Sequence, residues 1–254
     1  MKISIITVCR NSQDTIEHSI RSVLSQVDAE IEFIVVDGGS TDATLDIIRK
    51  YADRIQRIIS EKDNGMYDAL NKGIAVATGE VIGILHSDDY YSSPAILSGV
   101  LKAFATSGID AVYGDLQYVS KSDPDKIVRN WIAGPYTEGL FLKGWMPPHP
   151  AFFAKADCYR KFGSFNTQFR TAADYELMLR FIHKHKIRLA YIPQVLVKMR
   201  VGGKSNVSIG NRIRANREDR LAWKVNGLSP NMFTLSMKPL SKLKQFFFSS
   251  KVHF

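Results

Sequence analysis

The first 90 residues alternate short apolar runs with segments whose apolar residues recur every three or four positions. Residues 3–8 and 31–36 are short, mostly apolar runs rich in β-branched residues, which is typical of strands buried on both faces of a sheet. Shorter runs at residues 55–59 and 80–85 predict two more strands. The segments between these runs have helical spacing, as in the helix expected from Gly65 onward. This alternation predicts an α/β fold with a mostly parallel central sheet and helices on both faces.

The pattern becomes looser after residue 90. It predicts a helix over residues 94–106 and a strand over 111–119, followed by a long loop region at 121–150 that is rich in Pro, Gly and aromatic residues. Asp174 begins a clear helix that extends to His185. Two further helical stretches are expected near the C-terminus, over residues 209–225 and 239–249.

The composition is that of an ordinary folded protein, with 45% hydrophobic and 23% charged residues. No apolar run approaches the roughly 18 residues that indicate a membrane span, and the N-terminus lacks the pattern of a secretory signal. The two cysteines, Cys9 and Cys158, match no metal-binding or redox spacing. We therefore expect a cytoplasmic protein.

Acidic residues follow three of the predicted strands. Asp37 ends the second strand, Asp63 lies just past the third, and Asp88 and Asp89 follow the fourth. Each of these residues, taken alone, could be a solvated turn residue without a function. The carboxyl ends of neighbouring parallel strands, however, meet at one edge of a sheet, where ligands bind. A nucleotide sugar needs one carboxylate for its base or ribose and another to hold a divalent cation against its pyrophosphate. The three turns therefore predict a nucleotide-sugar site.

The chain resembles the family 2 glycosyltransferases, which have the nucleotide-sugar-binding fold called GT-A. The resemblance spans residues 3 to about 205 and follows the family's order of motifs. The matching segments are Ser4 to Asn11, Val35 to Asp42, Glu61 to Gly73, His86 to Asp89, and Ala173 to Arg180. It implies a catalytic domain over residues 1–205, with a nucleotide-binding half at 1–90 and an acceptor-binding half at 91–205. Residues 206–254 then form a separate C-terminal helical region.

The resemblance assigns roles on the donor side. Asp37 should hydrogen-bond the nucleobase, Asp63 should help to enclose it, and the guanidinium of Arg10 should stack on it. Asp88 and Asp89 should bind a divalent metal, Mn²⁺ or Mg²⁺, which would bridge the diphosphate oxygens. The expected donor contacts are Thr7, Arg10, Asp37, Asp63, Asp88 and Lys204. Asp68 and Asn71 are interpreted as braces of their loop.

The resemblance also implies the reaction. Asp174, at the start of a helix, corresponds to the catalytic base that takes the proton of the acceptor hydroxyl. Attack opposite the leaving diphosphate inverts the anomeric configuration, so a UDP-α-sugar would give a β-linkage. The chain lacks the Gln-x-x-Arg-Trp signature of processive synthases, and we expect one sugar to be added per encounter. Trp145 and His149 are the expected acceptor contacts, although a buried histidine in a Pro-rich turn explains His149 equally well.

Two departures from the family pattern leave an alternative open. His86 stands where the first acid of Asp-x-Asp is expected, and Ala173 replaces the acid that commonly precedes the base. His86 is interpreted as a packed residue at a strand end. The first change removes a possible metal ligand, and the second removes a carboxylate but leaves Asp174 in place. A catalytically inactive scaffold is therefore the alternative to an active transferase.

The net charge of +9 is concentrated in the last fifth of the chain. Residues 200–254 contain 11 Lys and Arg against two acids, whereas residues 1–199 contain 23 bases and 23 acids. A basic segment with apolar residues at helical spacing, such as Leu240, Leu243 and Phe247, suits an anionic membrane surface. We therefore expect peripheral binding at the inner face of the cell membrane. The expected acceptor is a saccharide on a polyprenyl diphosphate, as in assembly of bacterial surface polysaccharide such as O-antigen.

The basic segment is also compatible with two further roles. One is a solvated or packed helix that has no partner. The other is nucleic-acid binding, but the segment has no recognisable RNA-binding or DNA-binding motif, and the body presents an acidic edge. No nucleic-acid partner is therefore expected.

Overall fold

The fold is known from a computed structural model, which describes residues 1–201, 209–231 and 234 of the 254-residue chain. The strands are β1 (Lys2–Cys9), β2 (Glu30–Asp37), β3 (Arg57–Ser60), β4 (Val81–Ile84), β5 (Asp89–Tyr91), β6 (Ala111–Val119), β7 (Ile127–Trp131), β8 (Phe152–Lys155) and β9 (Leu189–Arg200). The helices are α1 (Ile16–Leu24), α2 (Thr44–Arg49), α3 (Met66–Val76), α4 (Ile96–Phe104), α5 (Ala156–Phe162), α6 (Ala173–Met178) and α7 (Ile209–Val225). Two 3₁₀ turns, η1 (Leu140–Lys143) and η2 (His149–Ala151), and a π-helical continuation of α6, η3 (Leu179–Lys184), complete the described elements.

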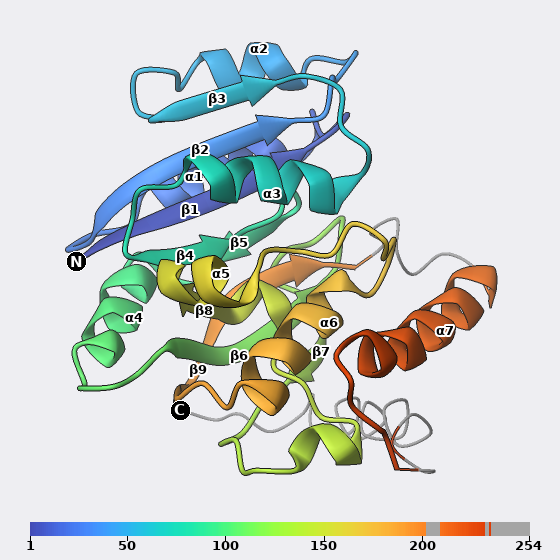
Figure 1. The fold of residues 1–254 in the computed structure, drawn as a ribbon. Coiled ribbons are helices and arrows are strands. Elements are labelled where there is room, and N and C mark those ends of the chain that lie inside the picture. The colour runs from blue at the N-terminus through green and yellow to red at the C-terminus, as the bar shows by residue number, and fades with distance from the viewer. Residues whose placement is uncertain (202–208, 232–233, 235–254) are drawn as a thin grey trace.

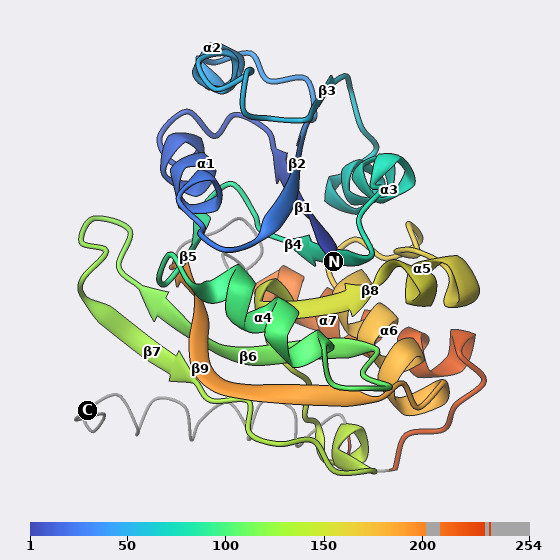
Figure 2. The same cartoon turned by 90° about the vertical axis from the view of Figure 1, so that its left-hand side faces the viewer.

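The described strands form one mixed sheet in the order β3-β2-β1-β4-β8-β6-β9-β5, with β7 beside β6. The N-terminal half is parallel, because β1 pairs with both β2 and β4, and β2 pairs with β3. In Figure 2, α1 and α2 lie on one side of these strands and α3 lies on the other. Covered on both faces, β1 contributes fully buried side chains such as Ile3, Ile5 and Ile6, which accounts for its continuous apolar run.

The second half of the sheet is joined to the first by antiparallel pairing. β8 lies between β4 and β6 and runs antiparallel to both. Gly83 of β4 marks a close approach, because a Cβ atom added there would lie 2.6 Å from Cδ1 of Phe153 on β8. Beyond β8, β6 pairs in parallel with the long strand β9, and β9 pairs with the short strand β5. The two halves therefore form one continuous sheet with a common core.

The predicted α/β fold is confirmed, and several predicted elements lie where the pattern placed them. The strand predicted over residues 111–119 coincides with β6, and the helix predicted over 209–225 coincides with α7. The region 121–150 is not only a loop: it contains β7 and the turn η1. β7 was missed because it pairs only with β6, outside the main strand order of the described sheet. Ile127 and Val128 are exposed there, so the strand shows no alternation of buried and exposed residues.

Helix α7 packs against α6, as Figure 1 shows at the lower right of the molecule. Ala222 and Trp223 of α7 are almost completely buried. The indole Nε1 of Trp223 donates a 2.9 Å hydrogen bond to the hydroxyl of Tyr175 on α6. The helix predicted over residues 239–249 lies outside the described residues. No helix that the structure describes combines the length and the apolar character needed to cross a bilayer.

Candidate active site

The three acidic turns lie at the carboxyl ends of neighbouring parallel strands. Asp37 is the last residue of β2 and pairs in register with Cys9, the last residue of β1. Asp63 follows β3, which pairs with the end of β2, and Asp88 follows β4, which pairs with β1. The geometry that the strand pattern predicted is therefore present, because parallel pairing directs all these ends toward the same edge.

The carboxylate of Asp37 is fully buried and holds the turn that follows it. Its Oδ2 accepts hydrogen bonds of 3.1 Å from the backbone amides of Gly39 and Ser40, and one of 2.9 Å from the hydroxyl of Ser60. The hydroxyl of Ser40 also donates to Oδ1. Asp37 thereby ties the start of one loop to the end of β3. The nucleobase contact expected of this residue stays a prediction.

Asp63 lies directly over Gly38. A Cβ atom added at Gly38 would be 2.0 Å from Oδ2 of Asp63 and 3.6 Å from Cβ of Arg10. Glycine is therefore the residue that lets the two loops approach this closely. Asp63 also accepts a 2.8 Å hydrogen bond from the backbone amide of Gly65, the N-cap residue of α3. The structure thus brings together Arg10, Asp63 and the turn after Asp37, as the sequence predicted.

A buried arginine holds the turn that contains Asp88. Arg200, the last residue of β9, donates a 2.7 Å hydrogen bond from its guanidinium to the backbone carbonyl of Asp88. The same guanidinium contacts Nδ1 of His18 and lies 5.0 Å from the centre of the Tyr90 ring. A second contact joins the hydroxyls of Ser87 and Ser12, whose oxygens are 3.0 Å apart. These contacts join the Asp88 turn to the loop after β1.

Asp89 is fully buried, and neither of its carboxylate oxygens is hydrogen-bonded to a residue that the structure describes. Burial, together with the neighbouring Asp88, raises the pKa of Asp89 well above its usual value. An unpartnered buried carboxylate fits a cation, since a bound positive charge would offset the cost of burial. No group of three or more His, Cys, Asp or Glu side chains within the described ranges is arranged as a complete metal site.

Asp174 is the second residue of α6 and makes contacts through both carboxylate oxygens. Its Oδ1 accepts a 3.3 Å hydrogen bond from the hydroxyl of Tyr67, which belongs to α3. Its Oδ2 lies 3.2 Å from Nδ1 of His149, and about one fifth of the Asp174 side chain remains exposed. Burial and the nearby Asp174 raise the pKa of Tyr67 far above its usual value, so Tyr67 stays a proton donor. Asp174 is therefore oriented yet accessible.

A second histidine connects Asp174 to the Asp88 turn. The rings of His86 and His149 meet edge to face, with their centres 5.4 Å apart. Burial, with a further contribution from His149, lowers the pKa of His86 to about 4, so His86 is neutral at pH 7. The histidine that replaces the expected acid is thus a packed, neutral residue beside the site, in agreement with its interpretation from the sequence.

Other predicted site residues are placed differently. Thr7 is fully buried in β1 and its hydroxyl has no partner among the described residues. Its donor contact stays a prediction. Trp145 packs against Tyr113, Tyr136 and Phe141, and its indole Nε1 donates to the carbonyl of Ala133. Its acceptor contact stays a prediction. Lys204 lies outside the described residues.

Asp68 braces the loop before α3, as predicted, whereas Asn71 holds the distant loop before α6 instead of its own. Oδ2 of Asp68 accepts a 3.0 Å hydrogen bond from the backbone amide of Asn64. Asn71 exchanges two hydrogen bonds with the backbone of Phe165, of 2.8 and 2.9 Å.

The sequence reasoning missed Tyr67 and Arg200 as site residues. Tyr67 lies four residues after Asp63 in the same motif, and this position was the available signal. Arg200 reaches the site only through the pairing of β9 with β5, which has no counterpart in the local sequence.

Comparison with known proteins agrees with this geometry. Residues 4–162 match the model of glycosyl transferase family 2. The chain belongs to this family. An uncharacterised glycosyltransferase of Mycobacterium tuberculosis is 33% identical over 184 residues, which cover 70% of this chain and 68% of the relative. The PGL/p-HBAD biosynthesis glycosyltransferase of Mycobacterium bovis is 28% identical over 211 residues, which cover 81% of this chain and 80% of the relative. The protein is therefore a glycosyltransferase.

Solved structures confirm the GT-A fold. S. aureus TarS 1–349 in complex with UDP-GlcNAc superposes with a TM-score of 0.70 at 16% identity, covering 98% of this chain and 74% of that one. The mannosyltransferase PcManGT from Pyrobaculum calidifontis, in complex with GDP-Man and Mn²⁺, gives a TM-score of 0.66 at 20% identity, covering 98% and 76%. At these identities the likeness shows the fold alone.

Replacing Gly38 by alanine should weaken donor binding by this glycosyltransferase. The added Cβ would meet the Asp63 carboxylate at 2.0 Å, so Asp63 must move away from the loop after β2. Loss of one hydrogen bond to a charged group corresponds to roughly 10- to 100-fold in affinity. Calorimetry of UDP binding checks this, with Gly99→Ala as the control, because nothing lies within 4 Å of a Cβ at that helical position. Native UDP affinity in a folded Gly38→Ala protein would contradict the role of Asp63.

Proposed function

We propose that this glycosyltransferase transfers a single sugar from a nucleotide diphosphate donor, a UDP-sugar, to a hydroxyl of a saccharide acceptor with inversion at the anomeric carbon. The observation that carries the proposal is the setting of Asp174. Its carboxylate is held by Tyr67 and His149 and remains partly exposed. Through His149 it is linked to His86, at the start of the turn that contains Asp88. A proton acceptor thus stands next to the acidic turns assigned to the donor.

The donor side of the proposal rests on the edge formed by Arg10, Asp37, Asp63 and Asp88. Arg10 is exposed and lies beside Gly38 and Asp63, where its planar guanidinium can stack on a base. Two proteins of the same fold have been solved with UDP-GlcNAc and with GDP-Man, which supports a nucleotide sugar as the donor class. Lys204 is proposed to meet the diphosphate.

In the proposed reaction the acceptor hydroxyl attacks the anomeric carbon on the face opposite the diphosphate. As the new carbon–oxygen bond forms, the bond from that carbon to the diphosphate breaks, and the hydroxyl proton passes to Asp174. A carboxylate is needed because the hydroxyl has a pKa far above 7. The hydrogen bond from Tyr67 and the contact with His149 fix both oxygens of Asp174, so one orientation is presented to the acceptor.

Asp88 and Asp89 are proposed to hold a divalent cation, Mn²⁺ or Mg²⁺. Such a cation, when bound, neutralises the charge that develops on the leaving diphosphate. Asp88 is the partly exposed carboxylate of the pair, and Asp89 is the buried one without a hydrogen-bond partner among the described residues. Arg200 fixes the backbone of Asp88 through its carbonyl, and Asp88 follows β4 at the carboxyl edge of the parallel strands.

The acceptor is proposed to be a saccharide on a polyprenyl diphosphate, used in bacterial surface polysaccharide assembly at the inner face of the membrane. The basic charge of residues 200–254 supports this. On α7, the side chains of Arg217, Arg220 and Lys224 are exposed at helical spacing on one face, where they can meet anionic headgroups. His149, which lies beside Asp174, is the proposed acceptor contact.

Asp174→Asn should leave the fold and UDP binding nearly unchanged and abolish most transfer. The change conserves shape but removes the proton acceptor, and loss of a general base typically costs about 10²–10⁴ in rate. Steady-state transfer to a saccharide acceptor measures it, with Asp157→Asn as the control, since Asp157 is an exposed acid of α5. Wild-type turnover in Asp174→Asn would refute the base assignment. Absence of transfer in the wild type across UDP-, GDP- and dTDP-sugars would favour the inactive scaffold.

Asp88→Ala should weaken UDP binding in the presence of Mn²⁺ and leave the weaker, metal-free binding unchanged. The diphosphate would lose the cation that offsets its charge. Paired calorimetric titrations with and without Mn²⁺ test this, and Asp53→Ala serves as the control because Asp53 is exposed on the loop before β3. If UDP binding by the wild type is indifferent to Mn²⁺ and Mg²⁺, the proposed cation role fails.

Removal of residues 238–254 should release the protein from anionic vesicles while transfer to a short, water-soluble acceptor continues. The removed segment carries four lysines and no acid, and each base near an anionic surface contributes about 1 kcal/mol. Co-sedimentation with phosphatidylserine vesicles and thermal melting of the same truncated protein are measured together. Unchanged sedimentation with a lowered melting temperature would show instead that the segment stabilises the fold.

A further inference from the structure

The loop that leads into α6 is held by a glutamate from a distant helix. Glu218 lies on α7, and its Oε2 accepts hydrogen bonds of 2.8 and 2.9 Å from the backbone amides of Thr171 and Ala172. The same oxygen accepts a 2.9 Å hydrogen bond from the Thr171 hydroxyl, and Oε1 accepts a 3.2 Å hydrogen bond from the amide of Arg170. Three consecutive amides therefore converge on one carboxylate.

This carboxylate is buried, and within the described ranges it forms no ion pair. Its negative charge is offset instead by the amides, and hydrogen bonds to an ionised acceptor are about twice as strong as neutral ones. The residue at the start of α6 cannot supply such a hydrogen bond with its own side chain. Ala172 is the N-cap residue of α6 and has no side chain that could cap the helix, and the structure records no side-chain cap there. Glu218 thus fixes the backbone up to the N-cap residue of α6, where the local sequence supplies no side-chain hydrogen bond.

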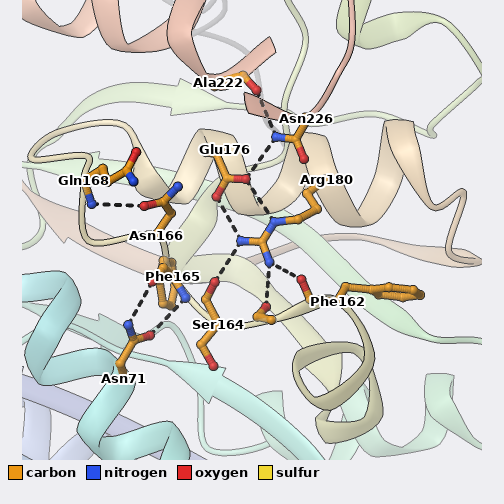
Figure 3. Close-up of polar contacts among 11 residues, drawn as sticks. Asn71, Phe162, Ser164, Phe165, Asn166, Gln168, Glu176, Arg180, Ala222 and Asn226 are labelled. Atoms are coloured by element: carbon orange, nitrogen blue, oxygen red, sulfur yellow. Dashed lines mark hydrogen bonds and ion pairs between the residues drawn. The ribbon is translucent and has the colours of Figure 1, made fainter. Parts of the chain in front are cut away.

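Further contacts hold the same loop and helix, as Figure 3 shows. Arg180 pairs with Glu176 at 2.9 Å and donates to the carbonyls of Gly163 and Ser164, both at 2.8 Å. Asn226, just past α7, donates a 2.9 Å hydrogen bond to Oε1 of Glu176. The segment from residue 162 to 172 is therefore fixed at its start by Arg180 and at its end by Glu218. Only the second anchor lies immediately before Asp174.

We propose that Glu218 is a positioning residue for Asp174. This rests on the proposed role of Asp174 as the base. Ala172, which donates to Glu218, is two residues before Asp174, and its carbonyl accepts the first hydrogen bond of the helix, from the amide of Glu176. If the Glu218 anchor is lost, the first turn of α6 is free to shift, and the Asp174 carboxylate shifts with it. A misplacement of about 1 Å costs up to about 10²-fold in rate.

The variant Glu218→Gln tests this with little change in volume. An amide group has one acceptor oxygen in place of two and carries no charge, so it cannot satisfy the three backbone amides together. We expect kcat to fall by about 10-fold or more, while KM for the donor and the UDP dissociation constant stay within about twofold. The control is Glu30→Gln, the same substitution at an exposed glutamate that is the first residue of β2. It should behave as the wild type.

A double variant separates positioning from general damage. In Glu218→Gln/Asp174→Asn the rate should equal that of Asp174→Asn alone, because there is no base left to misplace. An additional 10-fold loss in the double variant would overturn the proposal. If Glu218→Gln keeps full kcat while Asp174→Asn is inactive, the positioning role of Glu218 is also overturned. The proposed function of Asp174 would then stand. Full turnover in Asp174→Asn would instead refute the proposed function.

If Glu218→Gln does not fold, Thr171→Val provides the test. Valine has nearly the same shape and removes only the hydroxyl that donates to Glu218. We expect kcat to fall by about 2- to 10-fold, the range of one hydrogen bond, with donor KM and melting temperature nearly unchanged. A melting temperature that falls without any change in kcat would mean that the contact only stabilises the fold, and would overturn the proposal.

Discussion

Buried carboxylates that accept hydrogen bonds from backbone amides hold several loops of this protein, two of them at the candidate site. Asp37 fixes the turn after β2 and Glu218 fixes the approach to α6. Glu32 accepts from the amide and hydroxyl of Thr78, both at 2.7 Å, and Asp115 accepts from the amide of Ala133 at 2.8 Å. A buried carboxylate is costly unless its oxygens are satisfied. Each of these acids therefore specifies one conformation of its loop, because only that conformation supplies the donors.

Asp89 is the contrasting case. It is buried as completely as Asp37, yet within the described part of the chain neither oxygen has a hydrogen-bond donor. Burial raises its pKa, and the nearby Arg200 only partly opposes this effect. The structural acids are satisfied by the fold itself, whereas Asp89 carries a cost that the fold leaves uncompensated. Uncompensated groups of this kind are concentrated at functional sites, where a proton or a cation completes them.

The sequence was sufficient to predict the parallel half of the fold and the meeting of three acidic turns at one edge of the sheet. Strands such as β1 are buried on both faces, so their apolar runs are unambiguous, and parallel pairing then places Asp37, Asp63 and Asp88 at one edge. Asp174 could be named from its motif. The same information could not show that the Thr7 hydroxyl is buried without a partner among the described residues, because the motif marks a position in the strand without indicating which way its side chain points.

What the sequence could not provide are the contacts between segments far apart in the chain. Arg200 reaches Asp88 because β9 pairs with β5, and β5 is a three-residue strand without a pattern of its own. Tyr67 and His149 meet at Asp174 only after α3, η2 and α6 have packed. Each contact depends on tertiary arrangement, for which neither residue type nor spacing gives a local signal.

These distant contacts determine where the functional unit ends. The family match ends at residue 162, before Asp174, so the match alone would leave the proposed base outside the recognised segment. The helix that carries Asp174 is continuous with η3 and is covered by α7, and the amides before it are satisfied by Glu218. A chain cut after β9 would expose Tyr175, whose hydroxyl now accepts from the buried Trp223. The boundary predicted after residue 205 therefore separates two segments in the sequence, but the proposed base and the carboxylate proposed to position it lie on opposite sides of that boundary and are joined by hydrogen bonds to the loop before α6.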